Sequence, residues 1–83
     1  MTYDVQVEVQ VRAGVSDPQG ATVERALPAL GFDGVRDVKV GKSIRFCVDA
    51  NSEEEARAQV DELCNTFLTN PVIEDATIII GAA

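Results

Sequence analysis

The chain has 83 residues, enough for one domain, and carries a formal net charge of −7 at pH 7. Only 7 Lys and Arg side chains can neutralise phosphates and aromatic residues make up 5% of the chain, which argues against nucleic-acid binding. There is no histidine, so the commonest general base and the commonest metal ligand are both missing.

A β-strand is predicted at residues 3–12, where apolar and polar side chains alternate without a break. Its apolar positions are Tyr3, Val5, Val7, Val9 and Val11. One face of this strand should therefore be buried and the other wet, as in an antiparallel sheet with one solvent-facing side.

A helix is predicted to begin at Asp17-Pro18, because Asp accepts a hydrogen bond at the N-cap and Pro suits the first helical position. Apolar residues then follow the helical period at Val23, Ala26, Leu27 and Leu30. Pro28 should kink or fray the last turn, and Gly31 is a natural stop after it.

The middle of the chain is predicted to form a β-hairpin, since apolar residues alternate on both sides of a glycine. Directly opposed residues of an antiparallel pair share a face, so Val40 should oppose Ile44. By the same parity Val38 should oppose Phe46. This register leaves Gly41-Lys42-Ser43 as a three-residue loop, in which the glycine can supply a positive φ.

A second helix is predicted after Ser52, which forms a capping box with Glu55. Its apolar stripe consists of Ala56, Val60, Leu63, Cys64, Phe67 and Leu68. Asn70-Pro71 should end the helix, and a last strand is predicted at residues 72–80. The run Glu53–Glu55 invites a metal-site interpretation, but three carboxylates in a first helical turn are explained by the helix dipole.

The resulting order of strand, helix, strand, strand, helix, strand predicts a single α+β domain of the ferredoxin-like βαββαβ type. In this arrangement a four-stranded antiparallel sheet carries both helices on one face. The open face should be mixed in character and hold Asp4, Gln6, Glu8, Gln10, Arg45, Cys47 and Ile79. Because a small protein rarely exposes such an apolar strip, we expect Cys47 and Ile79 to contact a second copy.

No constellation of catalytic residues emerges, since Ser/His/Asp and Cys/His sets both need histidine. Gly41-Lys42-Ser43 matches the end of a phosphate-binding loop but lacks the upstream glycine. Glu74 and Asp75 are neighbours on a strand and should point to opposite faces. Cys47 and Cys64 are expected to be reduced structural thiols, with a disulfide or metal pair as the alternative. We therefore expect no catalytic residue, metal or bound cofactor.

The start of the chain has no basic segment followed by an apolar stretch, so no signal peptide is expected. The longest apolar run is far shorter than a membrane span. Together with the reduced cysteines, this predicts a cytoplasmic protein without membrane contact.

Three segments are informative together. They are Asp17-Pro18-Gln19-Gly20 at the first helix, Val-Lys-Val-Gly-Lys at residues 38–42, and Asn70-Pro71-Val72-Ile73-Glu74-Asp75 before the last strand. With these segments in this order, the chain resembles the PurS family, the small subunit of phosphoribosylformylglycinamidine synthase. The similarity extends over nearly the whole length.

The resemblance implies a role in de novo purine biosynthesis. In the complex, a synthetase subunit, PurL, uses ATP and Mg to activate formylglycinamide ribonucleotide for conversion to formylglycinamidine ribonucleotide. A glutaminase subunit, PurQ, releases the ammonia. The PurS-like subunit has no active site and binds no cofactor; it forms a homodimer or homotetramer and bridges the other two, supporting assembly and ammonia transfer.

Residue by residue, the resemblance implies only contacts with partner subunits. Gln19 is the best candidate because it has no capping duty, whereas Asp17, Pro18 and Gly20 also have local backbone roles. Lys42 should project from the hairpin tip, with a solvated loop lysine as the alternative. The remaining candidates are Asn70, Pro71, Glu74 and Asp75, for which a helix stop and a strand edge are the alternative.

Two other interpretations stay open. ACT domains share the predicted topology and bind amino acids between two copies, but fold alone is a weak reason to assign a function. An acylphosphatase-like enzyme would need an arginine-bearing loop after the first strand. Arg12 precedes Gly14 there, yet no suitably placed asparagine accompanies it.

Overall fold

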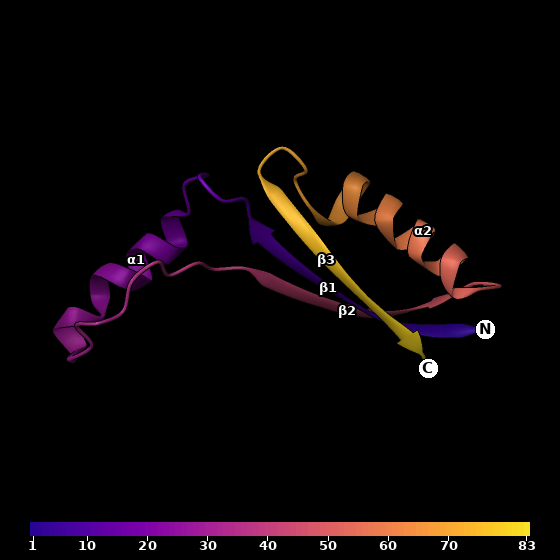
Figure 1. The fold of residues 1–83 in the computed structure, drawn as a ribbon, viewed down its shortest axis with the longest axis horizontal. Coiled ribbons are helices and arrows are strands. Elements are labelled where there is room, and N and C mark those ends of the chain that lie inside the picture. The colour runs from indigo at the N-terminus through magenta and orange to yellow at the C-terminus, as the bar shows by residue number, and fades with distance from the viewer.

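The computed structural model describes residues 1–83 and consists of two parts joined end to end (Figure 1). A sheet covered by one helix forms the body, and residues 13–41, with the other helix, extend from one end of the sheet as an arm. The molecule measures 52 × 26 × 15 Å along its principal axes, so it is long and thin for its size.

The body is built on three antiparallel strands in the order β2-β1-β3. They are β1 (Thr2–Val11), β2 (Lys42–Asp49) and β3 (Glu74–Ala82). The alternation predicted for β1 is confirmed, because Tyr3, Val5, Val7 and Val9 are all buried. Their partners on the same face come from both neighbouring strands; Val7, for example, lies opposite Ile44 and Ile78. The core therefore follows the central strand.

The predicted hairpin is wrong. Ile44 lies opposite Val7 instead of Val40, and Phe46 lies opposite Val5 instead of Val38. Gly41 does not have a positive φ either, and the segment before it runs outside the sheet. The sheet thus has three strands where four were predicted, and the missing one is the first half of the hairpin.

The physical reason lies in the backbone amides of the extended segment. The Val38 amide donates to Glu24 at 3.0 Å and the Val40 amide donates to Asp17 at 2.8 Å. Alternation of apolar and polar residues correctly indicated an extended backbone, but it carries no information about which group accepts its hydrogen bonds. Here two helix carboxylates take the place of a neighbouring strand.

α2 (Glu53–Leu63) covers one face of the sheet and continues into a π-helical turn, η2 (Cys64–Leu68). The Ser52 half of the predicted capping box is confirmed, since the Ser52 hydroxyl accepts the Glu55 amide at 3.1 Å, but the Glu55 carboxylate does not bond the Ser52 amide in return. The stripe positions Ala56, Val60 and Cys64 are buried. Phe67 was expected on this stripe but is 79% exposed, because the wider π turn rotates the residues that follow it.

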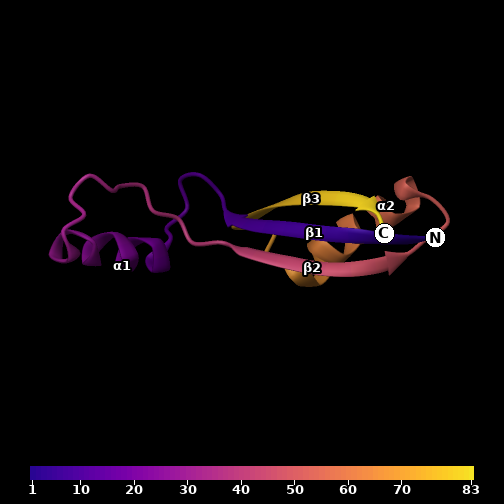
Figure 2. The ribbon, with the colours of Figure 1, turned by 90° about the horizontal axis from the view of Figure 1, so that it is seen from below.

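α1 (Pro18–Ala26) has the predicted start and is followed by a 3-10 turn, η1 (Pro28–Leu30). The expected effect of Pro28 and the stop at Gly31, with φ 95°, are both confirmed. Figure 2 shows α1 beyond the end of the sheet and α2 behind it, so the expectation that both helices cover one face is wrong. No helix has the length and apolar character needed to cross a bilayer.

Candidate docking sites

Asp17 ties α1 to the extended segment of the arm. One carboxylate oxygen accepts the Gly20 amide at 3.0 Å and caps the helix, and the other accepts the Val40 amide at 2.8 Å. These two hydrogen bonds, the one from Val40 above all, lower the pKa of Asp17. Asp17 is therefore occupied within its own chain, and we call its contacts, together with the Glu24–Val38 bond, the latch of the arm.

Gly20 serves the same latch. It is buried, and a methyl group added to its Cα would overlap the carbonyl oxygen of Val38. The Gly20 amide, at the start of the helix, is bonded to Asp17 and is not free for a partner. Pro18 and Gln19 are exposed between these two residues, so they are what this segment offers to a partner.

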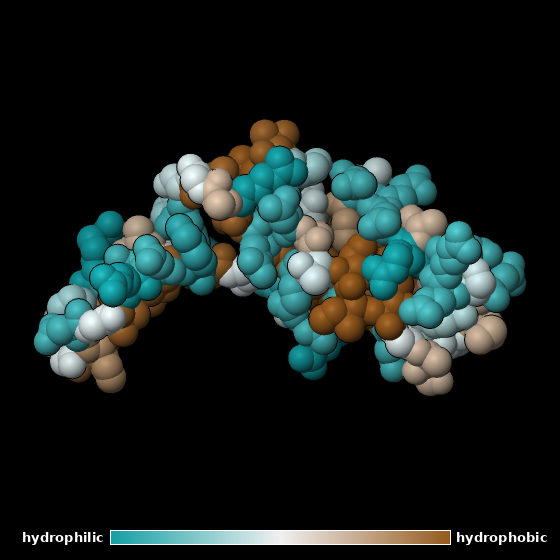
Figure 3. Space-filling model, viewed as in Figure 1, coloured by the Kyte–Doolittle hydropathy of each residue, from teal (hydrophilic) through white to brown (hydrophobic).

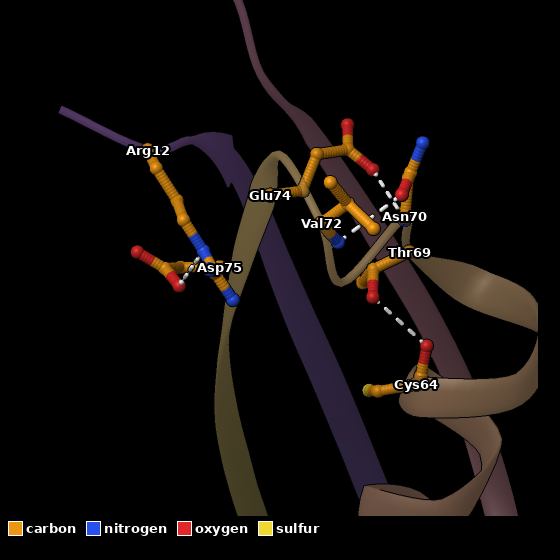
Figure 4. Close-up of polar contacts among 7 residues, drawn as sticks. All are labelled: Arg12, Cys64, Thr69, Asn70, Val72, Glu74 and Asp75. Atoms are coloured by element: carbon orange, nitrogen blue, oxygen red, sulfur yellow. Dashed lines mark hydrogen bonds and ion pairs between the residues drawn. The ribbon is translucent and has the colours of Figure 1, made fainter. Parts of the chain in front are cut away.

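The segment from Asn70 to Asp75 folds into a turn closed by its own polar groups (Figure 4). The Asn70 amide donates to Glu74 at 2.8 Å, and the Asn70 side chain accepts the Val72 amide at 3.1 Å. Asp75 forms an ion pair with Arg12 at 2.9 Å. The polar residues predicted to meet a partner thus shape the turn.

The turn exposes apolar side chains that the sequence did not single out. Val72 is 77% exposed at its tip, next to exposed Pro71 and half-buried Thr69. Val72 and Ile73 had been placed in the last strand, which in fact begins at Glu74. The one signal that could have exposed the error is Pro71, since an Asn-Pro pair initiates turns and shifts the strand start beyond it.

Lys42 does not lie at a hairpin tip, because it begins β2 and pairs with Val9. It lines a shallow depression of about 460 Å³ together with Lys39 of the arm and Glu8 and Ser43 of the sheet. Glu8 accepts hydrogen bonds from Gln6 and from Ser43, and these bonds lower the pKa of Glu8. Lys42 is exposed and remains available to an acidic group on a partner.

Cys47 and Ile79 lie on the open face of the sheet, as predicted, and line one shallow hollow of about 780 Å³. The Cys47 thiol donates to Asp4 at 3.1 Å, and this bond raises the pKa of the thiol. A thiol held protonated is a poor nucleophile. Cys64 is a second free thiol; it is buried, and burial raises its pKa. Ile79 is 53% exposed, in keeping with a contact surface.

Most predicted contact residues gather at one end of the body. Three segments lie where the arm leaves the sheet: the start of α1, the start of β2 and the turn before β3 (Figure 1). Cys47 and Ile79 lie farther along the strands. No group of three or more His, Cys, Asp or Glu side chains is arranged to hold a metal ion. Most of the predicted contact residues are therefore concentrated where the arm leaves the sheet.

Comparison with known proteins gives a consistent result. Residues 4–82 match the family model PurS, described as phosphoribosylformylglycinamidine (FGAM) synthase. The chain is 38% identical to phosphoribosylformylglycinamidine synthase subunit PurS of Methanocaldococcus jannaschii, over 92% of each chain. It is 37% identical to the subunit of the same name from Bacillus subtilis, over 88% of this chain and 86% of that one.

Solved structures agree with these relatives. A chain in the structure of PurLQS from Thermotoga maritima superposes with a TM-score of 0.87 at 33% identity, covering 98% of this chain and 99% of that one. The crystal structure of PurS from Methanocaldococcus jannaschii gives a TM-score of 0.85 at 36% identity, covering 98% of both chains. The α+β fold, with two helices and an antiparallel sheet, is therefore shared with these proteins.

Proposed function

Because the chain belongs to the PurS family of phosphoribosylformylglycinamidine synthase subunits, we propose that it works inside that enzyme as a docking subunit without an active site of its own. The observation that carries this proposal is the match of residues 4–82 to the PurS family model. A chain of the PurLQS structure also superposes on 98% of this chain. The partners are then a PurL-type synthetase and a PurQ-type glutaminase.

The reaction in which it takes part is the ATP- and glutamine-dependent amidation of formylglycinamide ribonucleotide in purine biosynthesis. ATP and Mg belong to the large synthetase subunit in this proposal, and this chain supports assembly and ammonia transfer. Its own chemistry is consistent with that division of labour. Asp17 is engaged in the latch, and the Cys47 thiol has a raised pKa.

The surfaces that remain for the partners are those left exposed at the arm end of the body. Gln19 and Lys42 keep their predicted roles, and Val72 joins them as an apolar contact. Other residues contribute indirectly, because their hydrogen bonds fix the backbone that carries these side chains. They are Asp17, Gly20, Asn70 and Glu74. Apolar side chains at the centre of an interface contribute most of its energy, with polar contacts around them.

We also propose that the chain is a cytoplasmic homo-oligomer. Its accessible surface is 5829 Å², whereas a compact monomer of this mass exposes roughly 4,800 Å². Its radius of gyration is 16.4 Å, against about 12 Å for a compact chain of this length. An isolated body with a projecting arm leaves more surface in water than a stable small domain does.

Reconstitution tests the proposal. The purified chain is mixed with the synthetase and glutaminase of its host, with glutamine and ATP present, and co-elution and glutamine-dependent product are measured. We expect a ternary complex and a rise in product. Val72→Asp should weaken assembly, while the matched control Ala58→Asp, on the exposed side of α2, should not. Absence of both complex and stimulation would refute the proposal.

A further inference from the structure

One stretch of the arm is held by no hydrogen bond from its own backbone amides. The turn after α1 is closed up to Phe32, whose amide donates to Leu27 at 3.0 Å. The next bonded amide is that of Val38, which donates to Glu24 at 3.0 Å. The amides of residues 33–37, which lie between these two, donate to no group of the chain. Local motion concentrates in exposed segments whose amides are unpaired.

Asp33 and Gly34 lie together in this stretch, and both are exposed. The Asp33 carboxylate takes part in no ion pair, since the one ion pair of the chain joins Arg12 and Asp75. An added Cβ at Gly34 would meet nothing within 4 Å, and the φ of Gly34 is not positive. The turn after α1 lies at the end of the arm far from the sheet, and no part of the body covers this end in the view of Figure 3. Neither packing nor hydrogen bonding therefore restrains this pair of residues.

An aspartate followed by a free and uncrowded amide can react with its own backbone. The nitrogen of the next residue attacks the side-chain carbon Cγ, so that a C–N bond forms and a C–O bond of the carboxyl group breaks. The amide proton leaves with the hydroxyl group as water. Water then opens the cyclic imide: opening at Cγ restores aspartate, and opening at the main-chain carbonyl gives isoaspartate. These steps need no oxidant and no reactant other than water, and they are intramolecular.

Gly34 is the most favourable residue to follow Asp33, because glycine has no Cβ to crowd the nitrogen and its backbone reaches the geometry of attack most freely. Other aspartates are followed by amides that the fold engages; they are Asp37, Asp49 and Asp61. The nearest alternative is Asn51, since the Ser52 amide also donates to no group. The side chain of Ser52 crowds the attacking nitrogen, whereas Gly34 has none.

We propose that Asp33 is a modification site, at which the chain converts spontaneously to isoaspartate. The product is an exposed isoaspartyl carboxylate, the substrate class of carboxyl methyltransferases that act on isoaspartyl residues. The conversion adds one methylene group to the backbone between Phe32 and Val38. Because the amides of residues 33–37 bond to nothing, this stretch takes up the added length while the latch contacts persist. The site depends on none of the docking roles of the proposed function.

Incubation of the full chain at neutral pH, followed by tryptic digestion and mass spectrometry, tests this inference. Arg25 and Arg36 flank the site, so Asp33 falls in the peptide Ala26–Arg36. Isoaspartate leaves the mass of this peptide unchanged, alters its chromatographic retention and is identified by electron-transfer fragmentation. We expect conversion in the native chain at a rate within about threefold of that in the free synthetic peptide, because local opening costs almost nothing here. Asp61, inside α2, is the internal control and should not convert over the same period.

Gly34→Ala is the matched variant, because the added methyl group meets nothing in the fold but crowds the attacking nitrogen. It should slow the conversion by about tenfold, which corresponds to about 1.4 kcal/mol of activation free energy. Methyl transfer from S-adenosylmethionine by an isoaspartyl methyltransferase gives a second readout. The incubated wild type should accept methyl groups, while the fresh chain and the incubated Gly34→Ala variant should accept far fewer.

Three results would overturn the inference. In the first, the peptide Ala26–Arg36 stays unconverted in the native chain while the free peptide converts. In the second, Gly34→Ala does not slow the conversion. In the third, Asp61 converts to the same extent as Asp33, which would mean that unfolding of the whole chain, and not local freedom, permits the reaction. None of these results depends on the synthetase or the glutaminase, so the reconstitution described above tests the docking role separately.

Discussion

The body and the arm each contain one short helix, and the two helices are built alike. α1 has 9 residues and is capped by Asp17, while α2 has 11 and is capped by Ser52, and each cap accepts an amide three residues ahead. Yet α2 buries Ala56 and Val60 in the body, whereas α1 buries only Gly20. The body is held by apolar burial and the arm by hydrogen bonds to carboxylates.

This difference explains why the arm can extend from the body. Burial of a continuous apolar face fixes α2 on its sheet and excludes water from both. The latch fixes α1 only to the segment that runs beside it, and leaves apolar side chains of both free for a second layer. Substitutions of one kind in both parts should therefore have very different effects.

The largest difference is expected from paired valine truncations. Val7 is 0% exposed in β1, so Val7→Ala should lower the free energy of unfolding by about 2–3 kcal/mol through lost burial and a residual cavity. Val23→Ala on the arm should change it by less than about 0.5 kcal/mol. Urea unfolding followed by circular dichroism, at a dilution where the chain is monomeric, measures both. Equal losses would contradict a division into body and arm.

A second comparison concerns two glycines of the arm. Gly20→Ala places a methyl group against the Val38 carbonyl, so the latch should open at a cost of about 1–3 kcal/mol, typical of overpacking. Gly34→Ala is the matched control, because an added Cβ there would meet nothing within 4 Å and its φ is not positive. Hydrogen exchange of the Val38 and Val40 amides measures whether the latch is closed, since both amides donate to its carboxylates. Equally slow exchange in both variants would show that the contact is not tight.

The latch should also respond to acid. The pKa of Asp17 is lower in the folded arm than in the unfolded chain, since Val40 and Gly20 donate to the ionised carboxylate. The ionised Asp17 carboxylate therefore stabilises the arm fully when the pH is above the ordinary aspartate pKa. This stabilisation is lost as the pH falls through the lowered pKa of Asp17. The Val40 amide shift in an NMR titration should follow this loss, with a midpoint below that of a free aspartate.

Asp17→Asn provides the test of that assignment. The variant should remove the acid transition at Val40 and speed exchange of this amide by about tenfold, the order expected when a cap is weakened. In α2 the group that accepts the capping hydrogen bond is the Ser52 hydroxyl, which does not titrate, so this cap serves as the internal reference. A midpoint at or above the ordinary aspartate value would contradict the latch.

The sequence was informative wherever one local rule decides the outcome. The alternation of β1, the caps at Asp17 and Ser52, and the stop at Gly31 all hold, because each depends on neighbours within a few residues. The hydrogen-bond acceptors of the extended segment could not be predicted. Apolar residues at Val38 and Val40 alternate with polar ones in the same way whether a strand or a carboxylate accepts their amides.

The candidate contact residues show the same limit. Asp17 and Asn70 stood out as polar residues in recognisable segments, and the structure turns their polar atoms toward their own backbone. Gln19 was named from the sequence because it has no capping duty, whereas nothing in the sequence singled out Val72, which the turn leaves 77% exposed. The polar residues of these segments thus shape their own turns, and the contacts with a partner stay a prediction.

The smallest effect is expected at the junction of arm and body, where Arg12 pairs with Asp75. The pair is well formed at 2.9 Å, but its side chains are 46% and 69% exposed, so water and salt screen it. Moreover, the Arg12 backbone amide donates to Ile73 at 2.8 Å, and this bond holds the end of β1 whatever the side chain.

A double-mutant cycle of Arg12→Ala and Asp75→Ala should therefore give a coupling of about 0.5 kcal/mol or less, falling further in 1 M salt, where the Debye length is about 3 Å. Urea unfolding of the four variants measures it. A coupling above about 1.5 kcal/mol that persists in salt would mean that the pair is shielded from water. In that case another surface, such as the arm of a second copy, must cover the junction where arm and body meet.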